Sequence, residues 1–413
     1  MTLKPLNKGP SKVTARSKVR KLRELYYITH IDNIPSILER GIMSHERIES
    51  EGIDFTPIYD REIVTNRKNI LAPNGKSLWS FANLYFNARN PMLYRVVCEK
   101  GADKIAVIGV DKKILDLDGV FVTDGNAASS YTSILRPSKK VLFKILEEVD
   151  RIFWSEFDSS KRKIMAECLV PEFIPPQYIR SIYFSDWEVM YKVNLKIPHL
   201  GRNIVLSRQP DMFFQPSREI QITQLLSIKE GDMFFSRMHT LTISVNCVGV
   251  MGKGIASRAK YQFPDVYVKY QDLCRQGKLK LGKPYLLKRE VPLDLELADH
   301  PETMTNHNGE TWFLLFPTKR HWRDRASLRG IEKGLQWICE NYKKEGIRSL
   351  AIPALGCGLG WLDWKDVGPI LCKYLSTLDI PVSIYLPVEK EVPEKYLSKE
   401  YLLRQSNLND FHE

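Results

Sequence analysis

The chain has 413 residues, of which 43% are hydrophobic and 27% charged, which predicts two or three domains with packed cores. Its formal net charge of +12 fits a polyanionic partner such as nucleic acid, although a merely basic, soluble surface would have the same charge. No apolar run is long enough to cross a membrane, and seven scattered cysteines without a Cys-x-x-Cys pair argue against a metal cluster or a disulfide framework. We therefore expect a cytoplasmic protein with no membrane partner and no metal.

The first half of the chain has few strong signals of regular structure. Its first 23 residues carry eight Lys or Arg and no acid, which indicates either a solvated terminus or a contact with nucleic acid. Residues 31–41 have helical apolar spacing and end at a glycine, and residues 105–110 and 179–184 are typical of strands. The stretch 197–218 holds three prolines and mixed charge, so a domain boundary is predicted there.

Beyond this boundary, segments typical of strands and helices alternate, which predicts an α/β sandwich with a largely parallel sheet. The predicted domains are residues 1–200 and 215–390, followed by a tail over 391–413. The predicted strands of the second domain are 240–245, 312–316, 349–353 and 382–386, and its most periodic helix is 329–344.

Two glycine-rich loops are the densest signal in the second half. Each follows a predicted strand and precedes a predicted helix, an arrangement in which backbone N–H groups can approach a phosphate closely. In an open α/β sheet, two such loops at strand ends mark a ligand crevice. The residues expected to hold the ligand are Asn246, Gly252, Lys253 and Gly254 in the first loop, and Gly356, Cys357, Gly358, Leu359 and Gly360 in the second.

Lys319 lies between these loops in the sequence, in the segment Leu315–Arg323. Pro317 is expected to end the preceding strand, and Lys319 would then follow it beside the crevice. A basic surface loop is the alternative reading, and the two glycine loops favour a role in the site.

Chemistry-bearing residues of the first half are harder to interpret. The residues 26–33, YYITHIDN, combine aromatic, hydroxyl and imidazole groups before a helix, but they also read as a strand end with helix caps. Residues 82–94 are aromatic-rich, and they are either core or a wall on which a ring stacks. Glu167 interrupts an apolar run, where an unpaired charge would be costly, and the alternative is an ion pair with Arg162 or Lys163 at a strand edge.

The second half resembles the macrodomain of DarG, the antitoxin of the DarT–DarG system. The motifs that carry the resemblance are SVNCVGVMGKGIA, FPTKRHW and IPALGCGLGWLDW. The resemblance implies an α/β/α sandwich in which Asp232 contacts adenine. It also implies that Lys319 is catalytic and attacks the anomeric carbon as a neutral amine, with a pKa lowered by burial or by a neighbouring Arg or His. Ile243 stands where the family usually has a second Asn, and Gly360 where some relatives have a catalytic Asp.

The first half resembles DarT, the toxin of the same system, in the segments YITHIDNIPSILERGI, NLYFNARNPMLY, DGNAASSYT and KIMAECLV. The resemblance implies an α+β ADP-ribosyltransferase fold that uses NAD as substrate, with Glu167 catalytic. Arg67 is the best match for the NAD-site arginine, with Lys68 and Arg61 as alternatives. Further NAD contacts are expected at Tyr27, Ile28, Thr29, Ser36 and Met43. Tyr27 replaces the family's histidine.

Together the two resemblances predict a fused toxin–antitoxin pair within one chain. The first domain would transfer ADP-ribose from NAD to a base of single-stranded DNA, with thymidine as the expected acceptor. The second would bind the ADP-ribose and remove it. The alternatives are a sensor of NAD or ADP-ribose with an inactive transferase, and a protein-directed transferase with its own eraser.

Overall fold

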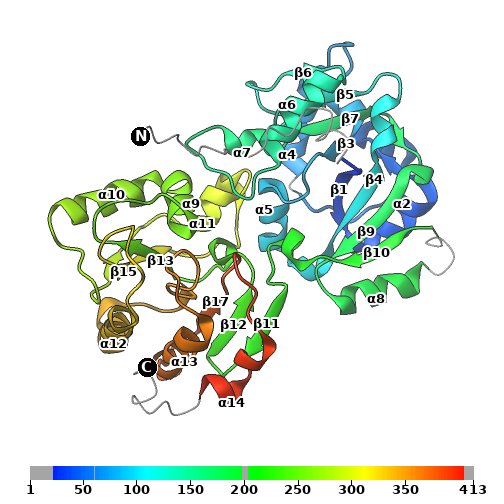
Figure 1. Ribbon diagram of the computed structural model, residues 1–413. Helices are drawn as coiled ribbons and strands as arrows, with labels where there is room; N and C mark the ends of the chain where they lie inside the picture. The colour runs from blue at the N-terminus through cyan, green and yellow to red at the C-terminus, as the bar shows by residue number, and fades with distance from the viewer. Residues whose placement is uncertain (1–21, 60, 198–202, 404–413) are drawn as a thin grey trace, which may run out of the picture. The chain divides into compact units, whose positions relative to one another are not determined.

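A computed structural model describes residues 22–59, 61–197 and 203–403 of the chain, and the basic segment before them lies outside. The chain forms two compact units (Figure 1). The first comprises Met1–Val96, Lys100–Ile152 and Ser159–Arg208, and the second comprises Val97–Glu99, Phe153–Asp158 and Gln209–Glu413. The main division at Arg208 lies inside the stretch 197–218. The second unit also takes up two short segments from the first half of the chain, and Trp154 from one of them is buried there, donating to the carbonyl of Leu297 at 2.9 Å.

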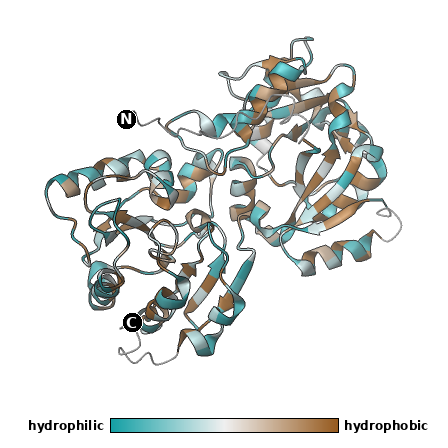
Figure 2. Ribbon diagram, viewed as in Figure 1, coloured by the Kyte–Doolittle hydropathy of each residue, from teal (hydrophilic) through white to brown (hydrophobic). Residues whose placement is uncertain are grey.

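The first unit contains an eight-stranded sheet whose strand pairs are antiparallel except for β10 with β9. Its strands are mainly hydrophobic (Figure 2), as expected for a sheet that helices cover. In spatial order they are β10 (Val205–Arg208), β9 (Ile179–Phe184), β4 (Ile105–Asp111), β1 (Glu24–His30), β3 (Phe81–Tyr85), β7 (Glu167–Pro171), β5 (Phe121–Thr123) and β6 (Ile134–Leu135).

The helices of this unit are short, and the first of them was anticipated from the sequence. Helix α2 (Ile34–Arg40) buries its apolar stripe and ends at Gly41, whose φ of +91° places it in the left-handed region. A Cβ there would lie 2.3 Å from the carbonyl oxygen of Ile174, so only glycine fits. The other helices are α3 (His45–Glu51), α4 (Arg61–Thr65), α5 (Pro91–Lys100), α6 (Lys139–Val149), α7 (Ser160–Lys163) and α8 (Trp187–Lys196), and the short strands β2 (Ile42–Met43) and β8 (Phe173–Ile174) pair separately.

The second unit contains a seven-stranded sheet with a parallel centre and antiparallel edges, which confirms the prediction of a largely parallel sheet. In spatial order its strands are β11 (Arg218–Gln221), β12 (Leu226–Glu230), β17 (Val382–Tyr385), β16 (Leu350–Pro353), β13 (Thr240–Asn246), β15 (Trp312–Lys319) and β14 (Tyr285–Leu287). Its helices are α9 (Gly254–Gln262), α10 (Pro264–Arg275), α11 (Leu293–Leu297), α12 (Leu328–Glu345), α13 (Trp364–Leu375) and α14 (Lys399–Leu402).

Alternating side chains of β15 pack against both layers of helices. Phe316 touches the backbone of α12 at Gly334, where a Cβ would lie 2.3 Å from its ring, so glycine allows this close packing. Phe313, an odd number of residues away, packs instead against Phe263 between α9 and α10, with ring centroids 5.1 Å apart. Since successive side chains of a strand point to opposite faces, this pattern makes the unit a helix–sheet–helix sandwich.

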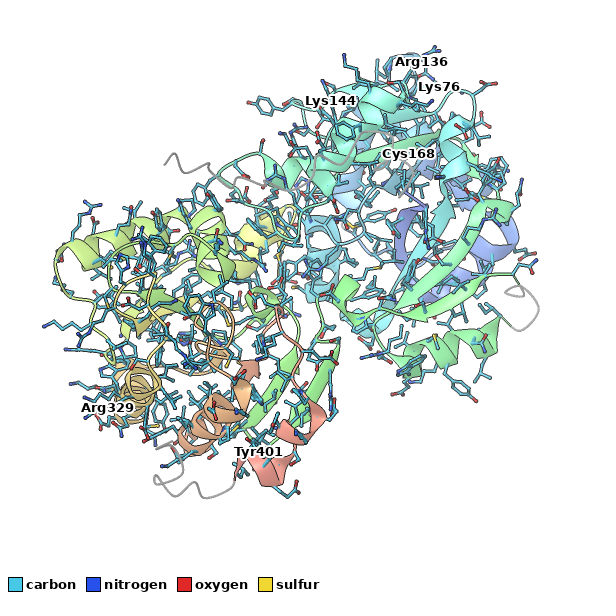
Figure 3. All side chains as sticks on the ribbon, viewed as in Figure 1. Lys76, Arg136, Lys144, Cys168, Arg329 and Tyr401 are labelled. Carbon is cyan, nitrogen blue, oxygen red and sulfur yellow. The ribbon has the colours of Figure 1, made fainter. Side chains whose placement is uncertain are left out.

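Two sequence expectations differ from the structure of the second unit. Pro317 does not end its strand: β15 continues to Lys319, and a shift in register between Val245 and Asn246 absorbs the residue that cannot donate a hydrogen bond. The predicted tail begins with folded structure, because Leu402 is buried and Tyr401 donates to the carbonyl of Lys365 at 2.8 Å (Figure 3).

Candidate active sites

Glu167 is the first residue of β7 in the first unit, and its side chain is only 1% exposed. Its carboxylate accepts hydrogen bonds from the Arg67 guanidinium at 3.0 Å and 3.5 Å, and from the Ala127 backbone N–H at 2.8 Å. The partner of Glu167 is therefore Arg67, and the ion pair with Arg162 or Lys163 that the sequence left open does not form. A buried carboxylate with a fixed cationic partner suits stabilisation of positive charge on a bound substrate.

The other two candidates for the NAD-site arginine are placed differently. Lys68 donates to the carboxylate of Glu49 at 3.2 Å and lies over the ring of Trp79. The side chain of Arg61 lies outside the part of the chain that the structure describes. Of these two described candidates, Arg67 reaches Glu167 and Lys68 does not. The Ser77 hydroxyl lies 3.1 Å from the Arg67 carbonyl and 2.9 Å from the Lys68 carbonyl, and so fixes the turn that carries both residues.

A pocket that is partly open to solvent lies in the same unit. It is formed by the end of β1, by α2 and by the segment that follows α3. Five of the predicted NAD contacts line it, namely Tyr27, Ile28, Thr29, Ser36 and Met43.

Asn33 holds the pocket together. Its side chain exchanges hydrogen bonds with the backbone of Thr56, donating to the carbonyl at 2.9 Å and accepting from the N–H at 2.8 Å. The same amide donates to the Thr29 hydroxyl at 3.2 Å. Asn33 thereby connects the start of helix α2 to strand β1 and to the segment around Thr56 on the other side of the pocket. Its side chain does not cap the helix, as the sequence suggested it would.

His45 and Tyr59 line the same pocket and were missed by the sequence analysis. The Tyr59 hydroxyl lies 3.1 Å from Nδ1 of His45, whose ring stacks on Trp79 with centroids 4.4 Å apart. Burial, together with the charge of Arg67, lowers the pKa of His45 to about 4, so its imidazole is neutral at physiological pH. The stacking partners are 34 residues apart in sequence, and nothing in the local pattern singles them out.

Tyr27, the residue in place of the family's histidine, is a neutral phenol in this setting. Burial raises its pKa to about 12, so its hydroxyl keeps its proton at any physiological pH. The aromatic segment 82–94 is core: Leu84, Tyr85 and Phe86 are buried, and Asn90 accepts from the Leu93 N–H at the start of α5.

In the second unit, three neighbouring parallel strands end at one edge of the sheet. β13 lies between β16 and β15, and Asn246 at its end pairs with Lys319 at the end of β15. The loop after β16 reaches the same place, because Leu359 accepts a hydrogen bond from the Lys319 ammonium at 3.2 Å. The two glycine loops and Lys319 are thus brought together at this edge.

Asn246 braces the first glycine loop from inside. Its carboxamide oxygen accepts from the Val248 N–H at 3.0 Å and from the Tyr270 hydroxyl at 2.9 Å, while its NH2 group donates to the Val250 carbonyl at 2.6 Å. With its side chain 6% exposed and bonded in this way, Asn246 shapes the loop that meets the ligand. In the same loop a Cβ on Gly252 would meet nothing within 4 Å, and Lys253 precedes Gly254, the first residue of α9.

The second glycine loop requires its glycines. Gly356 has a φ of +77°, and a Cβ on Gly360 would lie 2.6 Å from the Gly356 carbonyl oxygen. Cys357 is buried, whereas Leu359 is 47% exposed, with a methyl carbon 3.5 Å from where a Cβ on Gly254 of the first loop would lie. A methyl group on Gly358 would lie 3.2 Å from the carboxylate of Glu389.

Lys319 is held by backbone carbonyls. Besides Leu359, its ammonium donates to Asp324 at 3.0 Å and to Trp322 at 3.5 Å. Burial lowers the pKa of Lys319, and the negative charge of Asp324 opposes that shift. Of the two causes that the sequence left open, burial is the one that acts, and no Arg or His contributes to the shift.

Asp232, the predicted adenine contact, lies just before a short 3-10 helix and is bonded on both oxygens. One accepts from the Phe234 N–H at 3.2 Å, and the other pairs with Arg258 of α9 at 2.5 Å. Ile243, in place of the family's second Asn, is fully buried in β13. An apolar residue at that position therefore belongs to the core.

Two exposed tryptophans near Lys319 were not assigned from the sequence. Trp322 is 46% exposed and Trp361 is 66% exposed, and Trp361 directly follows the second glycine loop with a φ of +59°. Large aromatic rings left in solvent beside a binding loop can stack on a flat ligand.

Among the described residues no helix has the length and apolar character needed to span a membrane. The family model described as ssDNA thymidine ADP-ribosyltransferase, DarT, matches residues 26–214, and the Macro domain model matches residues 306–371.

Three similar proteins extend these matches. A DNA ADP-ribosyl transferase–DNA ADP-ribosyl glycohydrolase fusion protein of Thermosipho africanus is 57% identical over 385 residues, which cover 93% of this chain and 99% of that protein. A solved structure, Thermosipho africanus DarTG in complex with ADP-ribose, is 56% identical with a TM-score of 0.87, covering 92% of this chain and all of that one. A DNA ADP-ribosyl glycohydrolase of Mycobacterium tuberculosis is 34% identical over 164 residues, or 40% of this chain and 42% of that protein. The chain therefore belongs to the family of DarT–DarG fusion proteins.

Proposed function

We propose that the first unit transfers ADP-ribose from NAD to thymidine in single-stranded DNA, and that the second unit hydrolyses the product. The observation that carries this proposal is the 57% identity to a transferase–glycohydrolase fusion over nearly the whole length of both chains. The fusion keeps writer and eraser at a fixed one-to-one ratio and a high effective concentration.

For the transfer, NAD would occupy the pocket lined by Tyr27, Ser36 and Met43, with its nicotinamide-side ribose toward Glu167. As the glycosidic bond to nicotinamide breaks, positive charge grows on the sugar, and the Glu167 carboxylate would stabilise it. Arg67, which bonds both carboxylate oxygens, keeps that group oriented. The new bond forms to the thymine base, whose lost proton passes to Glu167 as the general base.

For the hydrolysis, the ADP-ribosyl group would lie between the two glycine loops, with its anomeric carbon facing Lys319. The amine must lose its proton before it can attack, and burial favours this because it disfavours the charged form. The Lys319 nitrogen forms a bond to the anomeric carbon as the bond from the sugar to the base breaks, and a proton of that nitrogen passes to the leaving base. Water then hydrolyses the bond between lysine and sugar, which releases ADP-ribose and regenerates the amine. Asn246 contributes by bracing the first loop, and Gly360 by allowing the second loop to fold on itself.

DNA as acceptor is supported by exposed cationic side chains of the first unit and by the net charge of the whole chain. Lys76, Arg136 and Lys144 are exposed, and their side chains project outward (Figure 3). The formal charge of +12 acts in the same direction, because phosphate neutralisation releases counterions. A cytoplasmic location is also proposed, since all seven cysteines are free thiols, as a reducing compartment maintains them.

The test is to incubate a thymidine-containing oligonucleotide and NAD with the unmodified protein and with Lys319→Ala, and to weigh the DNA by mass spectrometry. Modified DNA should accumulate with Lys319→Ala and stay low with the unmodified protein. Arg329→Ala, which removes an exposed charge from α12 (Figure 3), is the matched control and should behave like the unmodified protein. Unmodified DNA with every protein contradicts the proposal; binding of NAD without turnover would then favour a sensor, and label on added protein a protein-directed transferase.

A further inference from the structure

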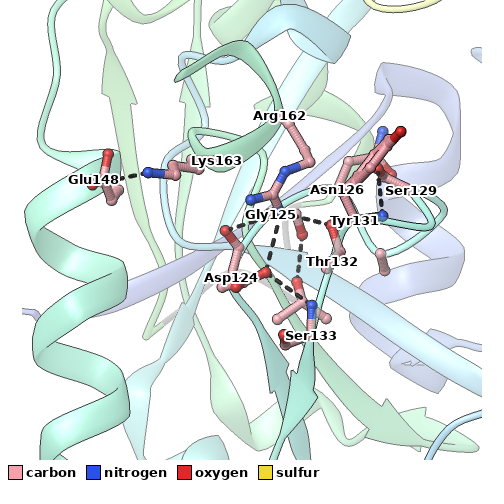
Figure 4. Close-up of polar contacts among 12 residues, drawn as sticks. Asp124, Gly125, Asn126, Ser129, Tyr131, Thr132, Ser133, Glu148, Arg162 and Lys163 are labelled. Atoms are coloured by element: carbon pink, nitrogen blue, oxygen red, sulfur yellow. Dashed lines mark hydrogen bonds and ion pairs between the residues drawn. The ribbon is translucent and has the colours of Figure 1, made fainter. Parts of the chain in front are cut away.

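Arg162 holds a surface loop of the first unit through hydrogen bonds from its guanidinium and to its backbone carbonyl. The loop, residues 124–133, joins β5 to β6, and Arg162 lies on the short helix α7 beside it. Its guanidinium Nη1 donates to the Thr132 hydroxyl at 2.8 Å and to the Asp124 carboxylate at 3.1 Å, and its carbonyl accepts from the Asn126 N–H at 3.0 Å (Figure 4). One residue thus joins the start of the loop, at Asp124 and Asn126, to its end at Thr132.

The loop is closed upon itself around this arginine. The Asp124 carboxylate accepts from the Ser133 N–H at 2.9 Å, and the Asp124 N–H donates to the Ser133 carbonyl at 3.3 Å. Gly125 lies directly against Arg162, since a Cβ there would come within 2.3 Å of Nη1 and 3.0 Å of the Arg162 carbonyl oxygen. The absence of a side chain at Gly125 is what lets the guanidinium reach both ends of the loop.

The inner side of the same loop contacts Glu167. The Ala127 N–H donates to the Glu167 carboxylate at 2.8 Å. The Thr123 hydroxyl, which precedes the loop, accepts from the Glu167 N–H at 2.8 Å and donates to the Gly125 carbonyl at 2.6 Å. The outer side carries Tyr131, whose ring is 85% exposed. A change in the loop's conformation would therefore move a donor that holds the carboxylate.

We infer that Arg162 is a positioning residue for the transfer reaction, holding the loop 124–133 in the conformation in which Ala127 fixes the carboxylate of Glu167. This inference rests on the proposed function of the first unit. Arg162 bonds to the loop rather than to Glu167, and so acts through the loop. Without its guanidinium, Asp124 and Thr132 lose their common donor, and the loop is no longer held where the Ala127 N–H meets the Glu167 carboxylate. Misplacement of a catalytic group by about 1 Å can cost about 100-fold in rate.

The experiment measures nicotinamide release by the full chain in the presence of single-stranded DNA, because later hydrolysis of the product does not reverse that step. Arg162→Ala should lower kcat by about 10- to 100-fold while KM for NAD changes less than about twofold, since the pocket for NAD is formed by other segments. Gly125→Ala should act in the same direction by displacing the guanidinium, and Arg162→Lys should restore part of the rate. The matched control is Lys163→Ala, whose ammonium contacts Glu148 on α6 at 3.3 Å (Figure 4) and which should keep full activity.

Hydrogen–deuterium exchange of the same proteins decides the inference separately from activity. The amides of residues 124–133, Ala127 included, should exchange faster in Arg162→Ala and Gly125→Ala than in the unmodified protein and Lys163→Ala. Unchanged exchange in both loop variants, or faster exchange with kcat retained, overturns the role of Arg162. If the unmodified protein releases no nicotinamide, the proposed function fails, while the exchange data still show whether Arg162 holds the loop.

Discussion

The ion pair between Arg67 and Glu167 leads to a quantitative prediction about stability. Glu167 is 1% exposed and Arg67 is 12% exposed, with 3.0 Å between their nearest atoms. Arg67→Ala would leave a buried carboxylate whose described partner is the Ala127 N–H. Breaking a buried pair from one side costs about 3–5 kcal/mol, and the remaining backbone donor places the expected cost toward the lower end. In a Glu167→Gln background, Arg67→Ala leaves no buried carboxylate without its cationic partner, so the second substitution should cost only about 1 kcal/mol.

The measurement is a double-mutant cycle followed by thermal and guanidinium denaturation. The two costs imply a coupling free energy of about 2 kcal/mol or more between Arg67 and Glu167. Since 1 kcal/mol shifts Tm by about 2–4 °C for a domain of this size, Arg67→Ala alone should lower Tm by roughly 6–20 °C. Lys68→Ala is the control from the same turn; its exposed pair with Glu49 should contribute less than about 1 kcal/mol. An equal loss from Arg67→Ala in both backgrounds would refute the reasoning, because it would show that no charge pairing had been lost.

Three further predictions concern the second unit. Removal of ADP-ribose should accelerate as pH rises, because burial lowers the pKa of Lys319 and only its neutral amine attacks. Asp324→Asn should raise the rate near pH 7 by at most about fivefold, because it removes the charge that opposes this shift. The measurement is a pH–rate profile, and a flat profile would exclude the amine as nucleophile. Gly360→Ala should destabilise the protein by about 1–3 kcal/mol and weaken ADP-ribose binding in calorimetry, because its methyl group would collide with the Gly356 backbone. Gly252→Ala has open space around it and should leave the stability unchanged. Equal stabilities of the two variants would contradict this steric argument. Trp361→Ala should slow hydrolysis of ADP-ribosylated DNA and weaken binding of that DNA by about 1–3 kcal/mol, because the exposed ring can stack on a base. Binding of free ADP-ribose should be unaltered. Equal losses for both ligands would show that the ring does not contact DNA.

Much of the fold could be predicted from the sequence because its signals are local. The helix before Gly41, the periodic helix 329–344 and the parallel centre of the second sheet follow from apolar spacing and from glycines at turns, and the structure has all three. The strand through Pro317 could not be predicted, because the missing hydrogen bond is absorbed by a shift in register against another strand.

The residues of the two sites were likewise predictable where their signal is local and not where it depends on contacts between distant segments. The glycine loops and Lys319 were visible because each lies at the end of a strand, and the pairing of Asn246 with Lys319 required only the sheet order. The sequence left open whether burial or a charged neighbour lowers the pKa of Lys319, and the structure shows that burial does. It gave no sign that Asn246 uses its side chain within its own loop.

The sequence alone determined which segments form strands, helices and glycine turns, because these depend on periodicity and on backbone freedom within a few residues. The tertiary structure decided which charges meet. Arg67 and Glu167 are 100 residues apart, and only the folded chain brings Arg67, on a short 3-10 turn, within hydrogen-bonding distance of Glu167 on β7. Partner choice depends on distance and burial, and the order of residues along the chain carries neither.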